Sequence, residues 1–402
     1  MAEFTAAEVA DVATIDFDRM RRQRRARLQA AMHSSGVDAV VLLGPSNHQY
    51  VDVGRAFADA ARVHHETVTV VFRADGDIHV WTPFPEAVHD IDVAQVHREL
   101  PLEYDEGVDA LARALREIVP GAERVGFDEL TSPMLGRLPA ALRGVEIIDA
   151  GVAIGPARLR KTRDEIECMR RAQHINELAM YDVEAALRPG VRQNELSAIL
   201  FRRAFELGIT WSCIDPIWSI TPPARGLGTR TTNGDVGFPL ASNDRFVREG
   251  DLVLPDTGLV WNGYHSDFGK TWICSVDPNP SPALRDCYRR WCDVIATAYA
   301  AIKPGRSCGD VARDVGAVEA EYRLQQFYLA HGAGCDSAEP PFIGSELGAE
   351  YEDTVELVPG MTFVLEPVIW VDGVGGYRSE EVVAVTEDGY ERLSTYGYTP
   401  FE

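Results

Sequence analysis

Several features of secreted, membrane-spanning and thiolate-metal proteins are missing from this sequence. It has seven cysteines, an odd number, and no two of them form a C-x-x-C pair. We therefore expect reduced thiols in a cytoplasmic protein, not disulfides or a thiolate metal site. No apolar run approaches the roughly 18 residues that cross a bilayer. The acidic N-terminal stretch also lacks the apolar segment of a signal peptide.

Positive charge is scarce as well. The sequence has 39 Lys and Arg against 62 Asp and Glu, which gives a formal net charge of -23. Nucleic-acid binding needs basic side chains that displace counterions from phosphates, so this balance argues against a nucleic-acid partner and disfavours an anionic membrane surface. What is present is 402 residues with 46% hydrophobic side chains, enough for two domains with sizeable cores.

Strands and helices alternate over the first 150 residues. Helical patterns at about 17–34 and 105–118 accompany the apolar run DAVVLLG, a hairpin pattern around 74–77, and the short strands RVGFD and VEIID. This alternation predicts an α/β layer. Gly151, Gly155 and Pro156 then mark a connection. We therefore expect one domain over residues 1–152 and a second over residues 153–402.

Two aspartates flank a hairpin signal in the second domain. Asp256 and Asp267 lie on either side of Trp261-Asn262-Gly263, and Asn-Gly is a strong signal for a two-residue turn. A turn at Trp261 and Asn262 makes the aspartates directly opposed, whereas a turn at Asn262 and Gly263 makes them diagonal neighbours. In both registers the carboxylates share one face of the hairpin. Burying two like charges this close together requires a cation.

Two glutamates repeat this arrangement near the C-terminus. Glu366 and Glu380 lie symmetrically about residue 373, within a loop between two strand-like runs. Glu366 stands inside the apolar run FVLEPVIW, where a carboxylate needs a partner. His331, in the segment HGAG, adds an imidazole. With the two aspartates, these donors predict a site for two divalent metal ions (Mn, Co, Fe or Zn), which would turn a bound water into a hydroxide nucleophile and polarise a substrate carbonyl.

The sequence resembles the pita-bread metallohydrolases, a family that includes prolidase, aminopeptidase P, methionine aminopeptidase and creatinase. The resemblance is carried by LLGPSNHQY, LRKTRDEIECMRRA, GDLVLPDTGLVWNGYHSDFGKTW, HGAG, GMTFVLEP and YRSEEVVAVTEDGYERL. All five metal-ligand positions of the family hold the family's residue types. The resemblance implies an α/β N-terminal creatinase-like domain plus an α+β pita-bread C-terminal domain with pseudo-twofold β-hairpins around a metal site. It also implies a homodimer.

Two histidines that the peptidases of this family use are replaced. Pro239 stands near the position of the first, and Ala338 occupies the position of the second. Neither side chain can titrate, and general acid–base help contributes roughly 100- to 10,000-fold to a rate. The sequence therefore departs from an ordinary Xaa-Pro dipeptidase, although the metal donors are complete.

Three functions remain open. The first is a dinuclear metal-dependent hydrolase of a small amide, an Xaa-Pro-like dipeptide or an amino-acid derivative, in which Glu366 or a neighbouring acid carries the proton. The second is a lyase of the dimethylsulfoniopropionate lyase type, which the RTTNG region and the ending ERLSTYGYTPF resemble. There Asp336 would be the base, although Gly258 stands where those lyases carry an extra acid. The third is a non-catalytic binding module.

Three further residues are candidates for the substrate pocket. Arg378, two residues before Glu380, could clamp a substrate carboxylate or form a salt bridge within the acidic site. His265 shares a strand face with Asp267, so it could shuttle protons or hold a ligand carboxylate. Tyr377 is expected beside the substrate, a small molecule or dipeptide.

Overall fold

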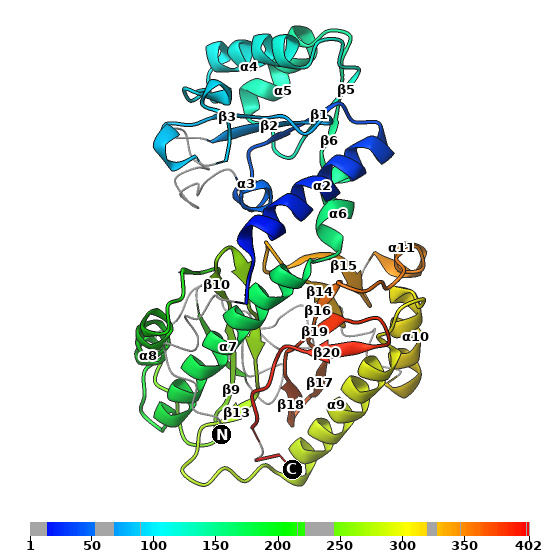
Figure 1. Ribbon diagram of the computed structural model, residues 1–402. Helices are drawn as coiled ribbons and strands as arrows, with labels where there is room; N and C mark the ends of the chain where they lie inside the picture. Colours follow the sequence, from blue (N-terminus) through cyan, green and yellow to red (C-terminus); the bar gives the residue numbers. More distant parts are fainter. Residues whose placement is uncertain are drawn as a thin grey trace. The chain divides into compact units, whose positions relative to one another are not determined.

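A computed structural model gives the fold (Figure 1) and describes residues 14–52, 68–88, 90–214, 216–221, 245–319, 328–345, 347–398 and 400–401. Its contacts divide the chain into an N-terminal unit, residues 16–162, and a C-terminal unit that begins at Arg163 and includes residues 14 and 15. This division falls after the predicted one because helix α6 (Gly151–Leu159) packs on helix α2 (Phe17–Ser35). A domain boundary between residues 152 and 153 stays a prediction. No helix in these described ranges is long and apolar enough to cross a bilayer.

The N-terminal unit is built on a six-stranded mixed sheet (Figure 1). The strand order is β4-β3-β2-β1-β5-β6. Strands β1, β2 and β3 pair antiparallel, whereas β5 and β6 continue the sheet parallel to β1. The bounds are β1 Ala39–Leu42, β2 Thr69–Arg73, β3 Ile78–Trp81, β4 Val96–His97, β5 Arg124–Phe127 and β6 Glu146–Asp149. This confirms the predicted α/β layer.

Helices cover both faces of this sheet. Helices α4 (Asp105–Ile118) and α5 (Ser132–Ala141) lie on one face, where Leu111, Leu115 and Met134 pack with Val41 and Phe127. Helices α2 and α6 lie on the other face (Figure 1). Strand β1 is buried along its whole length, which explains why its run is apolar without alternation. The short elements α3 (Pro45–Val51), η2 (Pro85–Ala87) and η3 (Val93–Gln95) complete the unit.

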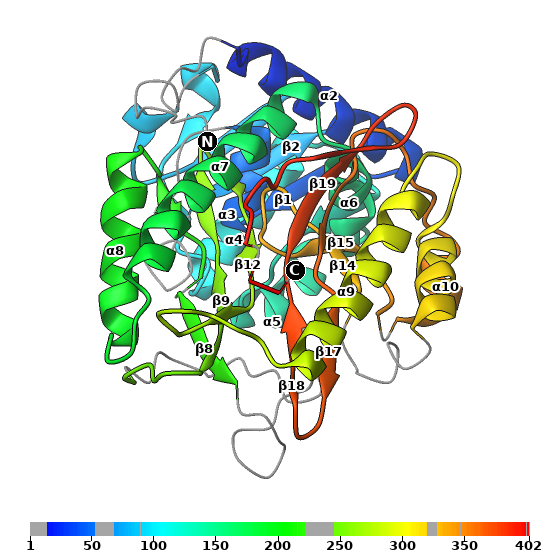
Figure 2. The same ribbon diagram turned by 90° about the horizontal axis from the view of Figure 1, so that it is seen from below.

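Helices of the C-terminal unit form two pairs (Figure 2). Helix α7 (Arg163–Ala186) packs on α8 (Gln193–Glu206), and α9 (Pro282–Ala301) packs on α10 (Cys308–Val318), which also contacts α11 (Gly348–Glu352). The side chain of Ser281 accepts a hydrogen bond from the backbone N of Leu284 at 3.2 Å, with Pro282 in the first helical position. This cap and the proline account for the start of α9 at Pro282.

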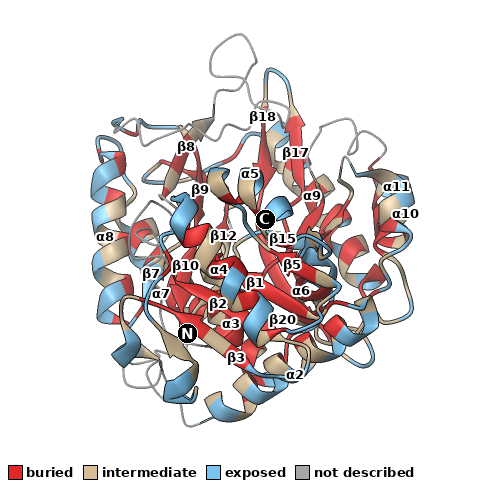
Figure 3. Ribbon diagram, turned by 90° about the horizontal axis from the view of Figure 1, so that it is seen from above, coloured by how far each residue is buried: buried red, intermediate tan, exposed pale blue. Residues whose placement is uncertain are grey.

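The strands of the C-terminal unit form paired hairpins beneath these helices. One sheet has the order β12-β9-β13 with β8 also on β9, another has the order β15-β14-β16-β19-β20, and β11-β10-β7 and β17-β18 form smaller sheets. Strand β9 is buried throughout, whereas α8 shows an exposed outer face (Figure 3). The bounds are β7 Trp211–Ser212, β8 Ile217–Thr221, β9 Leu252–Thr257, β10 Leu259–Trp261, β11 Tyr264–His265, β12 Phe268–Gly269, β13 Trp272–Ile273, β14 Ala330–Gly332, β15 Glu339–Ile343, β16 Thr362–Leu365, β17 Val368–Val371, β18 Gly375–Arg378, β19 Glu381–Val385 and β20 Tyr390–Arg392.

Candidate metal centre

The first hairpin turns at Asn262 and Gly263, whose φ angles are 48° and 80°. Two consecutive residues with positive φ form the turn that an Asn-Gly pair favours. The register places Asp256 opposite Gly269. Asp267, two residues before Gly269, is therefore the diagonal neighbour of Asp256, as expected for the second of the two predicted registers.

The second hairpin folds about residue 373, as predicted, because β17 and β18 pair symmetrically around it. The same register continues into β16 and β19, so Glu366 and Glu380 lie opposite each other where the strands diverge. The backbone N of Glu366 donates to the carbonyl of Leu329, and that of Glu380 donates to the carbonyl of Gly269, both at 2.9 Å. One glutamate is thus joined to the segment before His331 and the other to the first hairpin.

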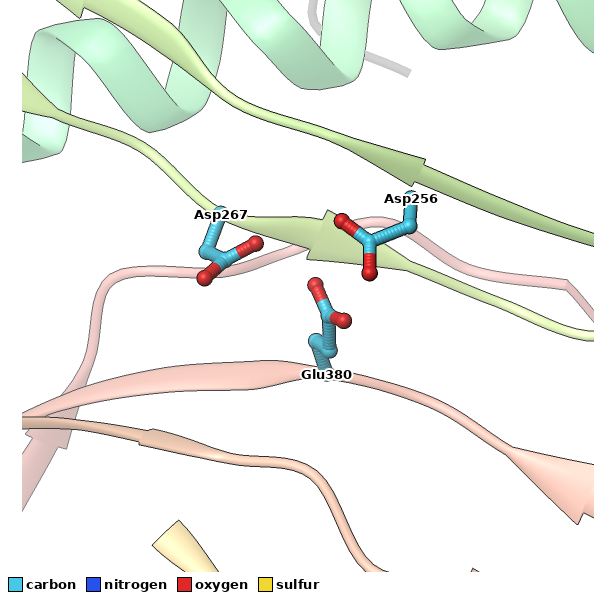
Figure 4. A group of neighbouring side chains, drawn as sticks. All are labelled: Asp256, Asp267 and Glu380. Carbon is cyan, nitrogen blue, oxygen red and sulfur yellow. The ribbon is translucent and has the colours of Figure 1, made fainter. Parts of the chain in front are cut away.

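These pairings bring the five predicted donors together. Carboxylate oxygens of Asp256, Asp267 and Glu380 lie within 4.8 Å of one another, and Figure 4 shows the three groups pointing toward a common region. The Nε2 atom of His331, on β14, lies 3.4 Å from Oδ2 of Asp267 and 3.2 Å from Oε1 of Glu366. All five side chains line one cavity of about 260 Å³.

Arg378 lies among these acids. Its guanidinium is 3.2 Å from Oδ2 of Asp256 and 2.5 Å from Oε2 of Glu366, and it also pairs with Glu380. Of the two interpretations of this residue, the internal salt bridge matches these contacts. One guanidinium cannot balance three carboxylates. Burial, with neighbouring acids, accordingly raises the pKa of Asp256 to about 7 and the pKa of Glu380 well above its usual range.

The imidazole of His331 is oriented by its second nitrogen. Nδ1 lies 2.8 Å from the carbonyl oxygen of Gly332, so it donates its proton there and turns Nε2 toward the carboxylates. Such a fixed tautomer is common for a histidine that binds metal. Burial opposes the charged ring, but the hydrogen bonds to Asp267 and Glu366 raise the pKa of His331 to about 10. A cation bound by the carboxylates would compete with that proton.

Two further observations indicate that this donor set suits divalent cations. Oε2 of Glu380 is buried and has no hydrogen-bond partner in the described part of the chain. Gly269 gives that carboxylate its room, since a Cβ there would lie 2.6 Å from the carboxyl carbon of Glu380. Carboxylate and imidazole donors suit Mn, Co, Fe or Zn. The residues present therefore form an acidic group that can hold metal.

Tyr377 lies away from the cavity. Neighbouring residues on a strand face opposite sides, so Tyr377 points away from the acids that Arg378 contacts. It packs edge-on against Tyr288, Trp291 and Phe401, with ring centroids 4.8, 5.0 and 5.0 Å away. The structure places it in an aromatic core, not beside a substrate as predicted.

His265 and Asp336 are both tied to the HGAG segment. His265 donates its backbone N and its ring Nδ1 to the carbonyl of Gly334, at 3.0 and 3.1 Å. Asp336 lies in the same loop, but the residues of this loop that line the cavity are Ser337 and Ala338. The predicted proton-transfer roles of His265 and Asp336 stay predictions.

Asn176 is a supporting residue that the sequence analysis missed. Its Nδ2 donates to the carbonyl of Thr257 at 2.9 Å and to Oγ of Ser266 at 3.1 Å, bridging the neighbours of the two aspartates. Its side chain is fully buried. The signal available in the sequence was a polar residue on the apolar face of helix α7, four residues from both Ala172 and Met180.

Cys213 and Tyr328 are cavity-lining residues that no motif marked. Backbone pairing places Cys213 at the cavity, because its backbone N donates to the carbonyl of Gly258 at 3.0 Å. Tyr328 packs edge-on against His331, with ring centroids 5.5 Å apart. The Cys213 contact joins segments far apart in the sequence, so local patterns carry no signal for it, whereas Tyr328 lies only three residues before His331.

Comparison with known proteins agrees with this fold. The sequence signature of Metallopeptidase family M24 matches residues 167–387, which is more than half of the chain. The chain belongs to metallopeptidase family M24. The signature of the Creatinase/Prolidase N-terminal domain matches residues 24–160 of this M24 protein. The predicted family and the predicted pair of domain folds are thereby confirmed.

Relatives of this M24 protein differ in their activities. It is 27% identical over 282 residues to an Xaa-Pro dipeptidase of Pyrococcus furiosus, which covers 69% of this chain and 75% of the relative. It is 26% identical over 413 residues to a dimethylsulfoniopropionate lyase, DddP, of Roseobacter denitrificans, covering 96% and 88%. A solved prolidase from Thermococcus sibiricus matches with a TM-score of 0.77 at 20% identity, over 96% of this chain and 98% of that one, which shows the shared fold.

Proposed function

We propose that this chain is a dinuclear metal-dependent hydrolase of a small amide, an Xaa-Pro-like dipeptide or an amino-acid derivative. The observation that carries the proposal is the meeting of five donors at one cavity: Asp256, Asp267, His331, Glu366 and Glu380. Two divalent ions (Mn, Co, Fe or Zn) held there would lower the pKa of a bound water and polarise a substrate carbonyl. Membership of family M24 supports this reading.

Glu366 is the residue that we assign to proton transfer. Its side chain is 2% exposed and lies within the cavity lining, so bulk water does not compete for it. Its Oε2 accepts from Arg378 at 2.5 Å, which fixes the carboxylate in orientation. A fixed carboxylate can take a proton from the attacking water and pass it to the leaving nitrogen. Arg378 then acts as a positioning residue that also balances charge.

A metal-dependent lyase of the dimethylsulfoniopropionate lyase type is the second candidate. The observation that favours it is the similarity to such a lyase across 96% of this chain. Asp336 would remove a proton next to the substrate carboxylate, and its neighbours Ser337 and Ala338 line the cavity. Gly258 counts against it, because a Cβ there would lie 2.2 Å from Sγ of Cys213, which leaves no room for an extra acid.

A homodimer and a cytoplasmic location stay predictions.

A substrate panel separates the two reactions. Protein loaded with Mn or Co is incubated with Pro-containing dipeptides, with small N-acyl amides and with dimethylsulfoniopropionate. Free amino acid or amine without dimethyl sulfide supports the hydrolase, and dimethyl sulfide alone supports the lyase. The metal-stripped protein is the control and should release neither product. Protein that holds its metals yet releases neither product would contradict both enzyme assignments and favour a binding module.

A further inference from the structure

Two histidines of the N-terminal sheet lie within hydrogen-bonding distance of each other. His79 is on β3, and His97 is on β4, the first strand in the sheet order. Trp81 pairs with His97 across the two parallel strands, and His79 lies two residues before Trp81, so all three side chains share one face of the sheet. Strand pairing thus brings together two imidazoles that are 18 residues apart in the sequence.

The two rings present a nitrogen to each other. Nδ1 of His79 lies 3.1 Å from Nε2 of His97, and the ring planes are parallel to within 2°. One of these nitrogens donates a proton and the other accepts it with its lone pair. A tetrahedral zinc ion holds two imidazole nitrogens roughly 3.3 Å apart, since each Zn–N distance is about 2.0–2.1 Å. An ion can therefore replace the shared proton after a small separation and a turn of the rings.

Charged neighbours favour an added cation at this pair. The hairpin between β2 and β3 carries the charges that act on His79, namely Arg73, Asp75 and Asp77. The guanidinium of Arg73 is shared by both acids, at 2.6 Å from Asp75 and 3.0 Å from Asp77. Two carboxylates against one guanidinium leave a net negative charge beside the pair. Partial burial also lowers the pKa of both histidines, so both rings are neutral at pH 7 and can offer a lone pair.

Trp81 supports the pair from the sheet. Its ring stacks on His97 with centroids 4.7 Å apart and lies 6.2 Å from the ring of His79. Trp81 is buried in the core cluster of this unit, so it holds His97 against the sheet. The two histidines are themselves partly exposed. Water can therefore fill the remaining coordination positions of an ion bound by both rings.

We propose that His79 and His97 form a second metal site, in which both imidazoles bind one zinc, nickel or copper ion and water completes the coordination. Imidazole suits these ions, whereas Mn prefers oxygen donors such as those of the carboxylate centre. The site does not depend on the proposed hydrolase, because it shares no residue with that centre. Two protein ligands hold an ion less tightly than four, so metal is added in the experiment.

Zinc titration of the Asp256→Asn, Glu366→Gln protein tests the site, because this parent lacks two donors of the carboxylate centre. Calorimetry should show one zinc ion whose affinity falls at least tenfold when either His79→Gln or His97→Gln is added. Glutamine can still hydrogen-bond to the remaining imidazole but is a poor metal ligand, so the substitution separates metal binding from the hydrogen bond between the strands.

His33→Gln, exposed on α2, is the matched control and should leave the affinity for zinc unchanged. Full affinity in either His79→Gln or His97→Gln, or no saturable zinc binding by the parent, would overturn the proposal.

Fluorescence gives a readout that is specific to this place in the fold. Copper(II) quenches tryptophan emission at short range, and Trp81 stacks directly on His97. Added copper should quench a saturable part of the emission, which should be missing in His97→Gln and retained in His33→Gln. Thermal unfolding without metal checks that the variants fold like their parent. Zinc should then raise the unfolding midpoint more in the parent than in His97→Gln; an equal rise, or equal quenching by copper, would contradict the site.

Discussion

The two units of this protein bury different kinds of side chain. Among the described residues of the N-terminal unit, the buried charged side chains are Arg24 and Lys161, and the core is otherwise mainly aliphatic and aromatic. The C-terminal unit buries a much larger set: Asp164, Glu165, Glu177, Asp256, Lys270, Glu319, Glu339, Glu352, Glu366, Arg378, Glu380 and Glu381. Burying charge costs stability, so the comparison agrees with the proposal that the metal centre lies in the C-terminal unit.

Charge balance separates two clusters within the C-terminal unit. Glu381 is matched by Lys270 at 2.9 Å and Arg392 at 2.8 Å and also accepts from Ser394 at 2.8 Å. Burial opposes its charge, but these cations lower the pKa of Glu381. By contrast, Asp256, Glu366 and Glu380 share the single guanidinium of Arg378, and His331 is the other basic group that the described residues place beside these acids and Asp267. A balanced cluster holds strands together, whereas an unbalanced one can take up added positive charge, as the proposed metal centre requires.

Removing two donors should have the largest effect. Asp256→Asn with Glu366→Gln takes one carboxylate from each hairpin, so we expect the bound metal, about two ions per chain, to be lost. The loss in affinity should exceed the roughly 10- to 100-fold that follows loss of an outer partner. Mass spectrometry of gently purified protein measures the metal content.

The metal-free double variant should be no less stable than metal-free wild type, because two repelling charges are gone. Thermal unfolding checks this. The control is Asp109→Asn in the N-terminal unit, which removes a carboxylate that pairs with Arg137 at 2.6 Å. It should keep the full metal content. Metal retained by the double variant would mean that the unbalanced cluster is not the metal site.

A substitution that creates a cavity in the core of the N-terminal unit should have the next largest effect, a loss of stability. Leu111 is fully buried between α4 and the sheet, so Leu111→Ala should cost about 2–5 kcal/mol of unfolding free energy. Trp81, the tryptophan of this unit, lies in the same cluster and reports its unfolding in urea by fluorescence. The matched control is Leu135→Ala, which is 62% exposed on α5 and should change stability by less than about 0.5 kcal/mol.

Metal content should be unchanged in Leu111→Ala, since no donor of the carboxylate centre lies in that unit. A parallel loss of metal would show that the two units do not divide stability and function as the burial pattern indicates.

Loss of the bridge that Asn176 makes should have an intermediate effect. Asn176→Ala frees Thr257 and Ser266, the neighbours of Asp256 and Asp267, so metal affinity should fall roughly 10- to 100-fold. Calorimetric titration with Mn or Co measures the change. Glu352→Gln is the control, because Glu352 is equally buried and binds the backbone N of Ser345 at 2.7 Å. It should alter stability but not metal affinity; equal affinities for all three proteins would contradict this role of Asn176.

Sequence periodicity predicted the parts of the site that depend on local pairing. Asn262-Gly263 marks its own turn, and the symmetric spacing of Glu366 and Glu380 about residue 373 follows from the side-chain alternation of strands. His331 alone gave a weak signal, because an isolated histidine has many structural roles, and it was predicted only as part of a set with the four acids. The register of the first hairpin stayed open between two choices, since Trp261 can precede or enter the turn.

Contacts between distant segments were beyond local patterns. Tyr377 was a miss of another kind, because the strand alternation that places Glu380 among the donors also places Arg378 on that face and Tyr377 on the opposite one. Cys213 reaches the cavity through its pairing with Gly258, which sequence spacing does not specify. Sequence spacing also could not decide whether Arg378 binds a substrate carboxylate or forms a salt bridge inside the site, because that depends on how many acids surround it.

The smallest predicted effect concerns a buried acid beside the site. Glu177 accepts hydrogen bonds from the backbone N and Oγ1 of Thr395, at 2.8 and 2.7 Å, and from Gln173 at 3.2 Å. Burial nevertheless raises the pKa of Glu177 above its usual 4.5. The folded state then holds a proton that the unfolded state has released, so this residue's contribution is full below about pH 4.5 and is lost as pH rises through the folded pKa.

Glu177→Gln removes this titration, so its unfolding free energy should decline less than that of wild type as pH rises above about 4.5. Urea unfolding of the metal-free proteins at several pH values measures the difference, with Glu206→Gln, exposed at the end of α8, as the control for loss of a carboxylate. The effect is small because Thr395 and Gln173 stabilise the ionised form. Parallel profiles for wild type and Glu177→Gln would mean that these hydrogen bonds offset burial completely, and that an acid can be held in this interior without any cost in stability.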